Sequence, residues 1–275
     1  MKTDFCPACE SKASGQIVKV KNQRFCTCSR CSTIWQCTGA SFCDYSERYF
    51  EQRGHTSSTS GIVLAKTLTF EAFWRNTAAP KDSIVLEVGC ATGLGLVAGR
   101  NQGWKMFGLD VADSAAKHAI DKGFPTGSVV KSLSELKSGL FSAVGFFDAL
   151  EHIPDPAEFL IKLEKHLLPN AEIIIVLPRA DTLSRRLLGR WWPHYLPDHW
   201  VHFTHEGIRL LAERTGYFLA REFVPRKMVT PFTLVRHFGL QNGVSFSAPT
   251  WPVFSFNIGQ GGYVLRRHPR ISSPQ

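Results

Sequence analysis

Short apolar runs alternate with amphipathic stretches between residues 83 and 178, and this alternation restricts the fold more than any other feature of the chain. SIVLEVG, KMFGLDV, SAVGFFDAL and EIIIVLP have the composition of buried strands. Between them, LGLVAGRNQG, DSAAKHAIDKG and DPAEFLIKLEKHLL have the spacing of helices. Because strands and helices alternate, we predict an α/β fold with a doubly wound, mainly parallel sheet.

Two of these helices carry start signals. Asp113 is expected to cap the second helix, and Asp155 the third, in which Pro156 occupies the first turn. A turn at residues 169–170, Pro-Asn, should separate the third helix from the last parallel strand.

Cysteines are concentrated at the N-terminus: seven of eight lie within the first 43 residues. In a reducing cytosol, such crowding is more typical of metal binding than of disulfides. QIVKVKNQRF, between two C-x2-C pairs, alternates as a β-hairpin does. Two facing thiolate pairs can complete a tetrahedral zinc site, which stabilises so small a module. We therefore predict a zinc ribbon with the ligands Cys6, Cys9, Cys28 and Cys31.

Three further cysteines leave alternatives open. Cys26 competes for one of the ligand positions, and Cys37 and Cys43 are left over. We interpret the spare cysteines as small buried hydrophobes, and a redox switch or a set of disulfides is the alternative.

The loop after the first strand, EVGCATGLGL, has the small residues of a nucleotide-binding turn. It lacks the Lys-Ser or Lys-Thr of a P-loop, and its glycines do not match the G-x-G-x-x-G spacing of dinucleotide folds. Glu87, at the strand end, would repel a pyrophosphate but attract an ammonium or sulfonium group. Asp110 ends the next strand, where a ribose is commonly bound. These features predict S-adenosylmethionine (SAM) as the cofactor.

LEVGCATG resembles motif I of class I SAM-dependent methyltransferases, an acidic residue followed by G-x-G-x-G. The similarity continues through GLD, FFDALEHIPDPAEFL, IIIVLP and DHWVHFTHEGIRLLAERTGY, and the last segment is similar to one in bacterial small-molecule and sugar methyltransferases. The N-terminal ribbon and the YSERYF segment resemble the same group. The chain departs from the pattern at Ala91, in place of the middle glycine, and at Ser32, in place of the glycine after the last ribbon cysteine.

The resemblance implies a Rossmann-like sheet of seven strands, in which FLAREFVP and GGYVLRRH form an antiparallel edge pair. It also assigns the contacts with SAM. The glycine loop would wrap the methionine part, an acidic side chain would bind the ribose hydroxyls, and SLSEL would border the adenine. For Glu87 and Asp110, the alternative is a structural role that caps the loop. The residues assigned to the cofactor are Glu87, Gly89, Ala91, Gly93, Asp110, Ser132, Leu133 and Asp148.

DALEHIPDP follows the fourth core strand, so its side chains should face the methyl group of SAM. His152 is the first candidate for the general base, because an imidazole titrates near neutral pH, and His199 is the second. Asp148, Glu151 and His152 resemble the acidic-histidine cluster of ubiquinone-pathway O-methyltransferases, where a divalent cation is implied, although those proteins have glutamate in place of Asp148. Alternatively, Glu151 and His152 only fix the loop before Pro154.

WWPHYLPDHWVHFTHEG is rich in histidine and aromatic residues, but its histidine spacing matches no standard metal motif. We predict an acceptor lid around residues 180–206, with Trp and Tyr side chains over the acceptor. Core packing of Trp191 and Trp192 is the alternative. Three arginines there either grip a phosphate of the acceptor or form a solvated helix face: Arg185, Arg186 and Arg190.

The formal net charge of +9 is compatible with an anionic or nucleotide-linked acceptor, and acidic residues interleave with most of the basic ones. No apolar run approaches the roughly 20 residues of a membrane span. The start, MKTDFCPACESK, has no apolar core of a signal peptide, so we expect a cytoplasmic protein without a membrane span.

The sequence thus predicts a SAM-dependent methyltransferase acting on a small-molecule hydroxyl or sugar carbon, in polysaccharide, quinone or secondary-metabolite synthesis. An RNA methyltransferase that uses the ribbon and the basic surface is one alternative. A non-catalytic zinc-ribbon interaction protein is the other. The expected layout is a zinc ribbon at 1–45, a linker and N-terminal helix at 46–79, a methyltransferase domain at 80–268 and a tail at 269–275.

Overall fold

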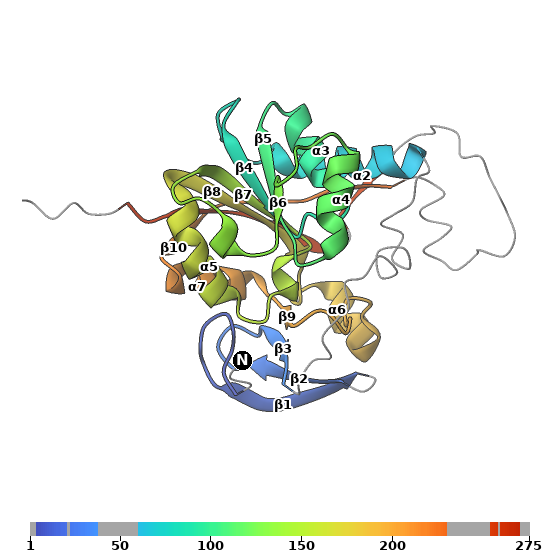
Figure 1. The fold of residues 1–275 in the computed structure, drawn as a ribbon. Helices are drawn as coiled ribbons and strands as arrows, with labels where there is room; N and C mark the ends of the chain where they lie inside the picture. Colours follow the sequence, from blue (N-terminus) through green and yellow to red (C-terminus); the bar gives the residue numbers. More distant parts are fainter. Residues whose placement is uncertain (1–3, 21–22, 38–59, 230–253, 258, 270–275) are drawn as a thin grey trace, which may run out of the picture.

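The computed structural model describes residues 4–20, 23–37, 60–229, 254–257 and 259–269. Cys43, most of the predicted linker, residues 230–253 and nearly all of the tail lie outside the described residues. The described residues form a large sheet flanked by helices and a smaller sheet beneath it (Figure 1). Within them, no helix is long and apolar enough to cross a membrane.

The large sheet has seven strands in the order β10-β13-β8-β7-β4-β5-β6. The neighbours from β8 to β6 pair in parallel, whereas β13 is antiparallel to both β8 and β10. This confirms the predicted α/β fold with an antiparallel edge pair. The strands are β4 (Ile84–Val88), β5 (Lys105–Leu109), β6 (Val129–Val130), β7 (Phe141–Phe147), β8 (Leu167–Pro178), β10 (Tyr217–Phe223) and β13 (Gln260–Arg267).

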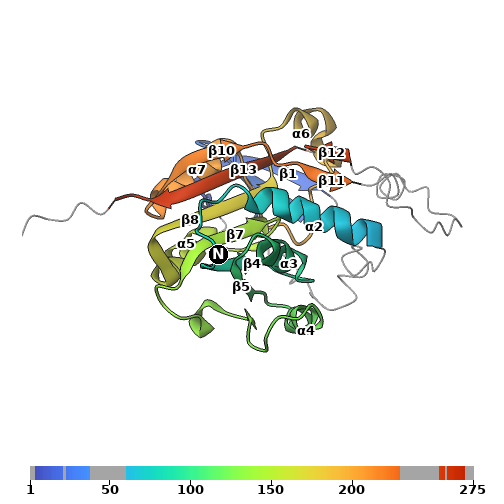
Figure 2. The same ribbon diagram turned by 90° about the horizontal axis from the view of Figure 1, so that it is seen from above.

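Helices cover both faces of this sheet (Figure 2). Neighbouring residues such as Val85 and Leu86, or Ile174 and Ile175, enter different apolar clusters because successive side chains of a strand point to opposite faces. One cluster includes side chains of α2 (Ser60–Trp74), α3 (Leu94–Asn101) and α4 (Asp113–Asp121), and the other includes those of α5 (Pro156–Leu163) and α7 (His205–Arg214). The sheet is therefore doubly wound, and its central strands are apolar on both sides.

Two local predictions were wrong. Helix α4 begins at Asp113 itself, and its N-cap is Ala112, whose amide donates to Asp110 instead. The predicted turn at residues 169–170 is part of β8, which begins at Leu167 and reaches its regular pairing with β7 after a register shift. The predicted cap of α5 is present, since the Asp155 side chain accepts from the Glu158 amide.

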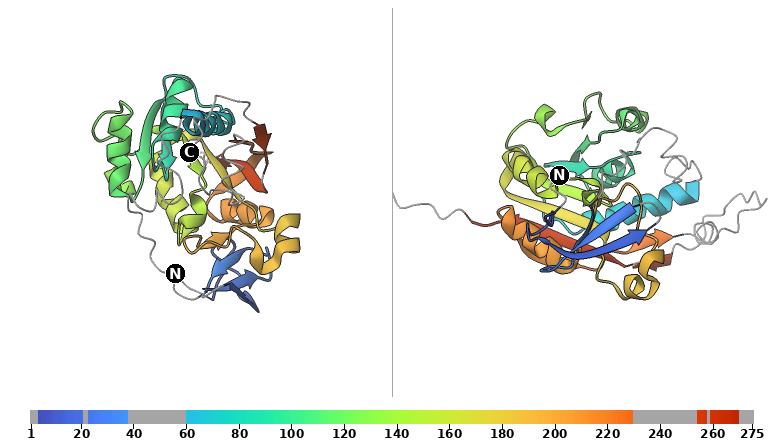
Figure 3. Two further views of the ribbon diagram at one scale, coloured as in Figure 1. Left: turned by 90° about the vertical axis from the view of Figure 1, so that its right-hand side faces the viewer. Right: turned by 90° about the horizontal axis from the view of Figure 1, so that it is seen from below.

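The smaller sheet, here called the ribbon, contains β1 (Ala13–Val20), β2 (Gln23–Cys28) and β3 (Ile34–Gln36), all paired antiparallel as the hairpin prediction requires. A fourth strand, β9 (Val201–His202), comes from far downstream and pairs with β3. The ribbon thus lies against the part of the chain that forms the seven-stranded sheet, and β9 from that part completes the ribbon's own sheet (Figure 3). The remaining strands, β11 (Lys227–Val229) and β12 (Phe254–Phe256), pair with each other.

The segment predicted as an acceptor lid packs on the ribbon. It contains α6 (Leu183–Leu188), and its Trp192 and Tyr195 are buried in a cluster with Phe25 and Ile34 of the ribbon. The phenol ring of Tyr195 lies 5.0 Å from the ring of Phe25. Trp192 and Tyr195 are therefore core residues, and the prediction that they cover an acceptor is wrong.

Candidate functional site

The loop after β4 leads directly into α3 and encloses the side chain of Glu87. A Cβ atom at Gly95 would lie 2.0 Å from Glu87 Oε1, so the carboxyl group occupies the space that this glycine leaves. Glu87 is buried, and its Oε2 has no hydrogen-bond partner among the described residues. Burial, together with the neighbouring Asp110, raises the pKa of Glu87 well above its usual value. A cationic ligand would stabilise the charged form of such a buried carboxyl group, which has no compensating charge beside it in the part of the chain that the structure describes.

The backbone of this loop turns through left-handed conformations. Gly89 has a φ of 76°, and a Cβ atom there would lie 2.8 Å from Ala149 Cβ. Gly93, the N-cap of α3, has a φ of 73°. Ala91, between them, adopts a φ of 43°, a region that a side chain disfavours. Ala91, which stands where the motif has its middle glycine, therefore adopts the backbone conformation of a glycine at an energetic cost.

Asp110 joins the loop to the end of β5. Its Oδ2 accepts from the Ala91 amide at 2.7 Å, and its Oδ1 accepts from the Ala112 amide at 2.9 Å. Burial raises the pKa of Asp110, although both amide hydrogen bonds act in the opposite direction. The loop-capping role that was the alternative is thus present. Each carboxylate oxygen can accept a second hydrogen bond, so the contacts leave room for a ribose hydroxyl.

The two residues assigned to adenine lie after β6, at the same edge of the sheet as Asp110. Ser132 caps the short 3₁₀ helix Leu133–Glu135, and its side chain and backbone both bond with Glu135. Ser132 is exposed and Leu133 is half-buried. Both follow β6, which pairs with β5, the strand that Asp110 directly follows, and their assignment to the adenine stays a prediction.

Asp148, directly after β7, is held by residues from the C-terminal strands. Lys227 Nζ lies 2.6 Å from Asp148 Oδ2, and Gln260 donates to Asp148 Oδ1. Asp148 has a φ of 52°, within the left-handed region that aspartate tolerates. The ion pair with Lys227 removes Asp148 from the predicted cation cluster, because its charge is already compensated.

In the structure, His199 instead of Asp148 lies beside Glu151 and His152. Ligand atoms of Glu151, His152 and His199 lie within 4.8 Å of one another. Burial, with Asp148 nearby, raises the pKa of Glu151 well above its usual value. Neither Glu151 oxygen has a hydrogen-bond partner among the described residues. All three residues predicted as catalytic therefore share one site, where a buried acid lies beside two imidazoles.

His152 is oriented by a segment far along the chain. Its Nδ1 lies 2.9 Å from the carbonyl oxygen of Asp198 and 3.5 Å from the Oδ2 of the same residue. A carbonyl only accepts, so Nδ1 carries the proton and Nε2 is the basic nitrogen of the neutral ring.

The ribbon fixes the segment that orients His152. The buried side chain of Gln36, on β3, donates from Nε2 to the carbonyls of Pro197 (2.9 Å) and His199 (2.8 Å). The backbone amide of Gln36 donates to the carbonyl of Trp200, and the backbone amide of Trp200 donates to the carbonyl of Glu151. A continuous chain of hydrogen bonds thus connects the ribbon with the residues at the end of β7.

The four cysteines predicted as zinc ligands converge at one end of the ribbon. Their sulfur atoms lie 3.4 Å apart in the pair Cys9–Cys28 and 3.6 Å apart in the pairs Cys6–Cys31 and Cys9–Cys31. A tetrahedral Zn–S₄ centre with bonds of about 2.3 Å has sulfur–sulfur edges of roughly 3.8 Å. Cys26 is not part of the cluster but interacts with Cys37. The four-cysteine arrangement therefore fits a metal ion.

Four residues that complete the site were not identified from the sequence. Gln36 and Lys227 carry no motif, and only tertiary contacts bring them to the site. Asp198 precedes His199 directly, and that adjacency was the one available signal. Gly108 belongs to the GLD motif: a Cβ atom there would lie 2.6 Å from Cys90 Sγ, so this glycine provides space for the loop.

Comparison with known proteins identifies this arrangement. Residues 63–221 match the family model described as a methyltransferase domain. The ubiquinone biosynthesis O-methyltransferase of Caulobacter vibrioides is 30% identical over 189 residues, which are 65% of this chain and 74% of that protein. The enzyme of the same name from Nitrosococcus oceani is 27% identical over 153 residues, 53% of this chain and 61% of that protein.

Solved structures share the fold. A SAM-dependent methyltransferase from Aquifex aeolicus is similar with a TM-score of 0.52 at 14% identity, over 82% of this chain and 98% of that one. The magnesium protoporphyrin IX methyltransferase of Synechocystis PCC 6803, solved with bound SAH, has a TM-score of 0.52 at 15% identity, over 81% of this chain and 95% of that one. The chain belongs to the methyltransferase domain family and is a SAM-dependent methyltransferase.

Proposed function

We propose that the protein transfers the methyl group of SAM to a hydroxyl oxygen of a small-molecule acceptor. The observation that carries this proposal is the oriented imidazole of His152 at the carboxyl end of β7, beside the buried carboxyl group of Glu151. A hydroxyl acceptor must lose a proton as the methyl group arrives, and a sugar carbon would require a different activation. The two relatives named O-methyltransferases favour the same acceptor atom.

The cofactor loop fits SAM. Glu87 would bind the ammonium group of the methionine part, because the residue is buried and its Oε2 has no hydrogen-bond partner among the described residues. Asp110 would accept from the ribose hydroxyls while it holds the Ala91 amide. Gly89 and Gly93 would let the backbone approach the ligand closely. Ser132 and Leu133 would border the adenine.

When bound, SAM supplies an electrophilic methyl carbon, and the protein aligns the acceptor for an in-line displacement. His152 Nε2 would accept the proton of the acceptor hydroxyl as the new O–C bond forms. Asp198, which is buried and close to Nδ1, would stabilise the resulting imidazolium. Glu151 would stay protonated in this state, since burial and Asp148 both raise its pKa.

A divalent cation is the second candidate at this cluster. Glu151, His152 and His199 would hold it, and it would polarise the acceptor hydroxyl as a Lewis acid. Glu151 would then exchange its proton for the metal. Methyl transfer that requires added Mg²⁺ and is abolished by chelation favours the cation, whereas chelator-resistant transfer favours the general base.

The ribbon cysteines would hold a structural zinc ion. Burial raises the pKa of Cys28 to about 11, whereas the hydrogen bond with Cys6 lowers the pKa of Cys31 to about 5, so a metal would bind one thiolate directly and displace protons from other thiols. Unpaired thiols and a bound zinc ion both suit a reducing cytoplasm, which we propose as the location.

Incubation of the protein with SAM labelled in the methyl group and a total cell extract tests the proposed function. We expect the label in a dialysable product, formed by the wild type and strongly reduced for Asp110→Ala. Label that remains with precipitated RNA or protein would reject the small-molecule acceptor. Failure of the wild-type protein to bind SAM in calorimetry would reject the function as a whole.

A further inference from the structure

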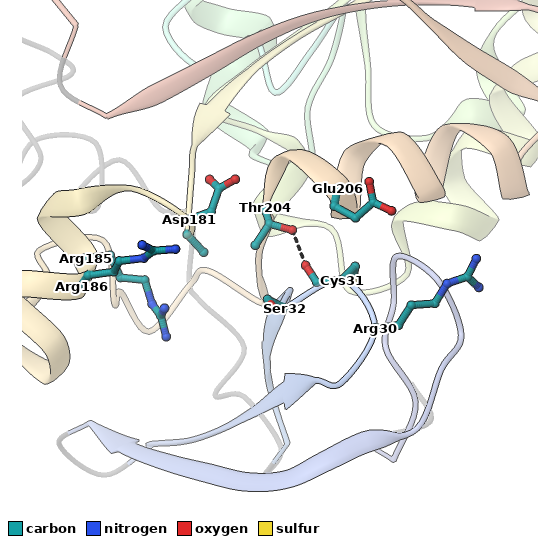
Figure 4. A pocket seen from close by; sticks show the side chains of 9 residues that line it. Arg30, Cys31, Ser32, Asp181, Arg185, Arg186, Thr204 and Glu206 are labelled. Carbon is teal, nitrogen blue, oxygen red and sulfur yellow. Dashed lines mark hydrogen bonds between the residues drawn. The ribbon is translucent and has the colours of Figure 1, made fainter.

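A groove of about 320 Å³ lies between the ribbon and the methyltransferase domain (Figure 4). Residues 30–32 of the ribbon form one wall, and α6 with the residues before it forms the other. Thr204 and Glu206, at the start of α7, complete the lining, and the Thr204 hydroxyl donates to the carbonyl of Cys31 at 2.5 Å. None of its lining residues has been assigned to SAM or to the metal except Cys31. Its volume suits a small molecule.

The two carboxylates in this groove are already compensated. Asp181 accepts two hydrogen bonds of 2.8 Å from Arg179, which lower the pKa of Asp181 although its burial acts in the opposite direction. Glu206 accepts two bonds, of 2.6 and 2.8 Å, from Arg209, and these lower the pKa of Glu206. Both acids are therefore ionised, and each is paired with an arginine outside the groove lining.

Three arginines in the lining have no such partner. Arg30 stands on the ribbon, and Arg185 and Arg186 extend from α6 on the opposite side (Figure 4). Within the described ranges, no carboxylate forms an ion pair with any of the three, and the Arg185 side chain donates only to the Tyr195 hydroxyl, at 3.4 Å. Both walls therefore carry positive charge without a paired carboxylate among the described residues, and the guanidinium group of Arg30 points away from those of Arg185 and Arg186 (Figure 4). Guanidinium groups match phosphate oxygens in geometry as well as in charge.

We propose that this groove binds a phosphate or diphosphate group, and that this group belongs to the methyl acceptor. The assignment to the acceptor rests on the proposed function, whereas the anion site itself does not. The ribbon would then select the acceptor as well as support the catalytic loop. A groove closed by two walls accommodates one or two phosphates rather than the continuous backbone of an RNA.

Calorimetric titration of the full-length, metal-loaded protein with inorganic pyrophosphate tests the site. We expect saturable binding by the wild type and a loss of affinity of about tenfold or more in Arg186→Ala and in Arg30→Ala, because each removes charged donors. Arg190→Ala is the matched control, since Arg190 lies on the same segment but does not line the groove. This variant should bind pyrophosphate with the affinity of the wild type. Absence of binding, or equal affinity in all variants, would overturn the proposal.

Two parallel measurements distinguish this proposal from the others. SAM affinity should be unchanged in all three arginine variants, and a parallel loss would show a general structural defect and overturn the site. Pyrophosphate binding by a wild type that transfers no methyl group would retain the anion site and reject the proposed function. An oligoribonucleotide that binds more tightly than pyrophosphate, with a steep salt dependence and the same arginine dependence, would overturn the small-molecule site in favour of RNA.

Discussion

The cofactor loop and the acceptor side of the site are built in different ways. On the loop side, Glu87 at the end of β4, Ala91 in the loop and Gly95 in α3 lie within one short segment, and Asp110 follows after α3 and β5. The acceptor side consists of residues from the end of β7 that are held by residues 197–200, which are held in turn by β3. The first half depends on local backbone geometry, and the second depends on contacts between distant segments. Substitutions in one half should therefore leave the other half intact.

The largest effect is expected on the acceptor side, at His152. His152→Ala removes the proposed base, so methyl transfer should fall by about 10²- to 10⁴-fold, while the dissociation constant of SAM should change little. His268→Ala, at an exposed histidine after β13, is the control and should transfer at the wild-type rate. A His152→Ala protein that retains most of its rate would exclude this residue as the base.

On the cofactor side, Asp110→Ala should weaken SAM binding by about 30- to 100-fold, because charge-assisted hydrogen bonds to the ribose and to the loop are lost. Isothermal titration measures this affinity directly. Asp110→Asn keeps one acceptor for the Ala91 amide and should bind with intermediate affinity. Equal SAM affinity in the wild type and in Asp110→Ala would reject the assignment of the ribose contact.

His202 provides a pH test of the packing between the ribbon and the methyltransferase domain. Burial lowers the pKa of His202 to about 3, whereas the unfolded residue titrates near 6.5. The unfolded state therefore binds the proton first as the pH falls, and folding stability is lost below about pH 6.5. As the pH falls from 7.5 to 5.5, the contribution of His202 to the free energy of unfolding should decrease by about 1.4 kcal/mol.

His202→Phe keeps the aromatic contacts with Phe25 and Tyr195 but cannot titrate. The difference in free energy of unfolding between the wild type and this variant, measured with urea at several pH values, isolates the histidine. A difference that stays constant from pH 7.5 to 5.5 would contradict the buried, neutral state of His202.

The smallest effect is expected at Ala91. Ala91→Gly relieves the left-handed backbone at a φ of 43° but increases the entropy of the unfolded chain, so the free energy of unfolding should rise by about 0.5–1 kcal/mol. Gly93→Ala is the matched reverse change at a φ of 73°, where space for a methyl group exists, and it should destabilise. Destabilisation by Ala91→Gly in denaturant titrations would show that the methyl group contributes packing that exceeds the strain.

The same contrast explains what the sequence could predict. Glu87, Asp110 and the four ribbon cysteines were found because their roles follow from spacing within a strand, a loop or a knuckle. The seven-stranded sheet was predictable for a similar reason, since each strand and helix has its own periodicity. Local rules also produced the error at Asp113, because the helix already begins at this residue and the N-cap position falls on Ala112.

The acceptor side could be predicted only in part. His152 and Glu151 follow a core strand and were identified by position, but Asp198, Gln36 and Lys227 reach the site through tertiary contacts. The pairing of β3 with β9 has no sequence signal, because both strands are very short. Aromatic residues near Trp192 were assigned to a lid because nothing in the sequence indicates that the ribbon lies against them.

The most direct test of the central claim, that the ribbon builds the acceptor side, uses Gln36→Leu. This variant removes the buried amide that donates to the carbonyls of Pro197 and His199. We expect about a tenfold lower methyl-transfer rate, with SAM affinity unchanged, in a protein whose thermal unfolding remains cooperative. Gln23→Leu, which removes an exposed contact of 3.3 Å to the same Pro197 carbonyl, should transfer at the wild-type rate. A folded Gln36→Leu protein with an unchanged rate, or a parallel loss of SAM affinity, would contradict the claim.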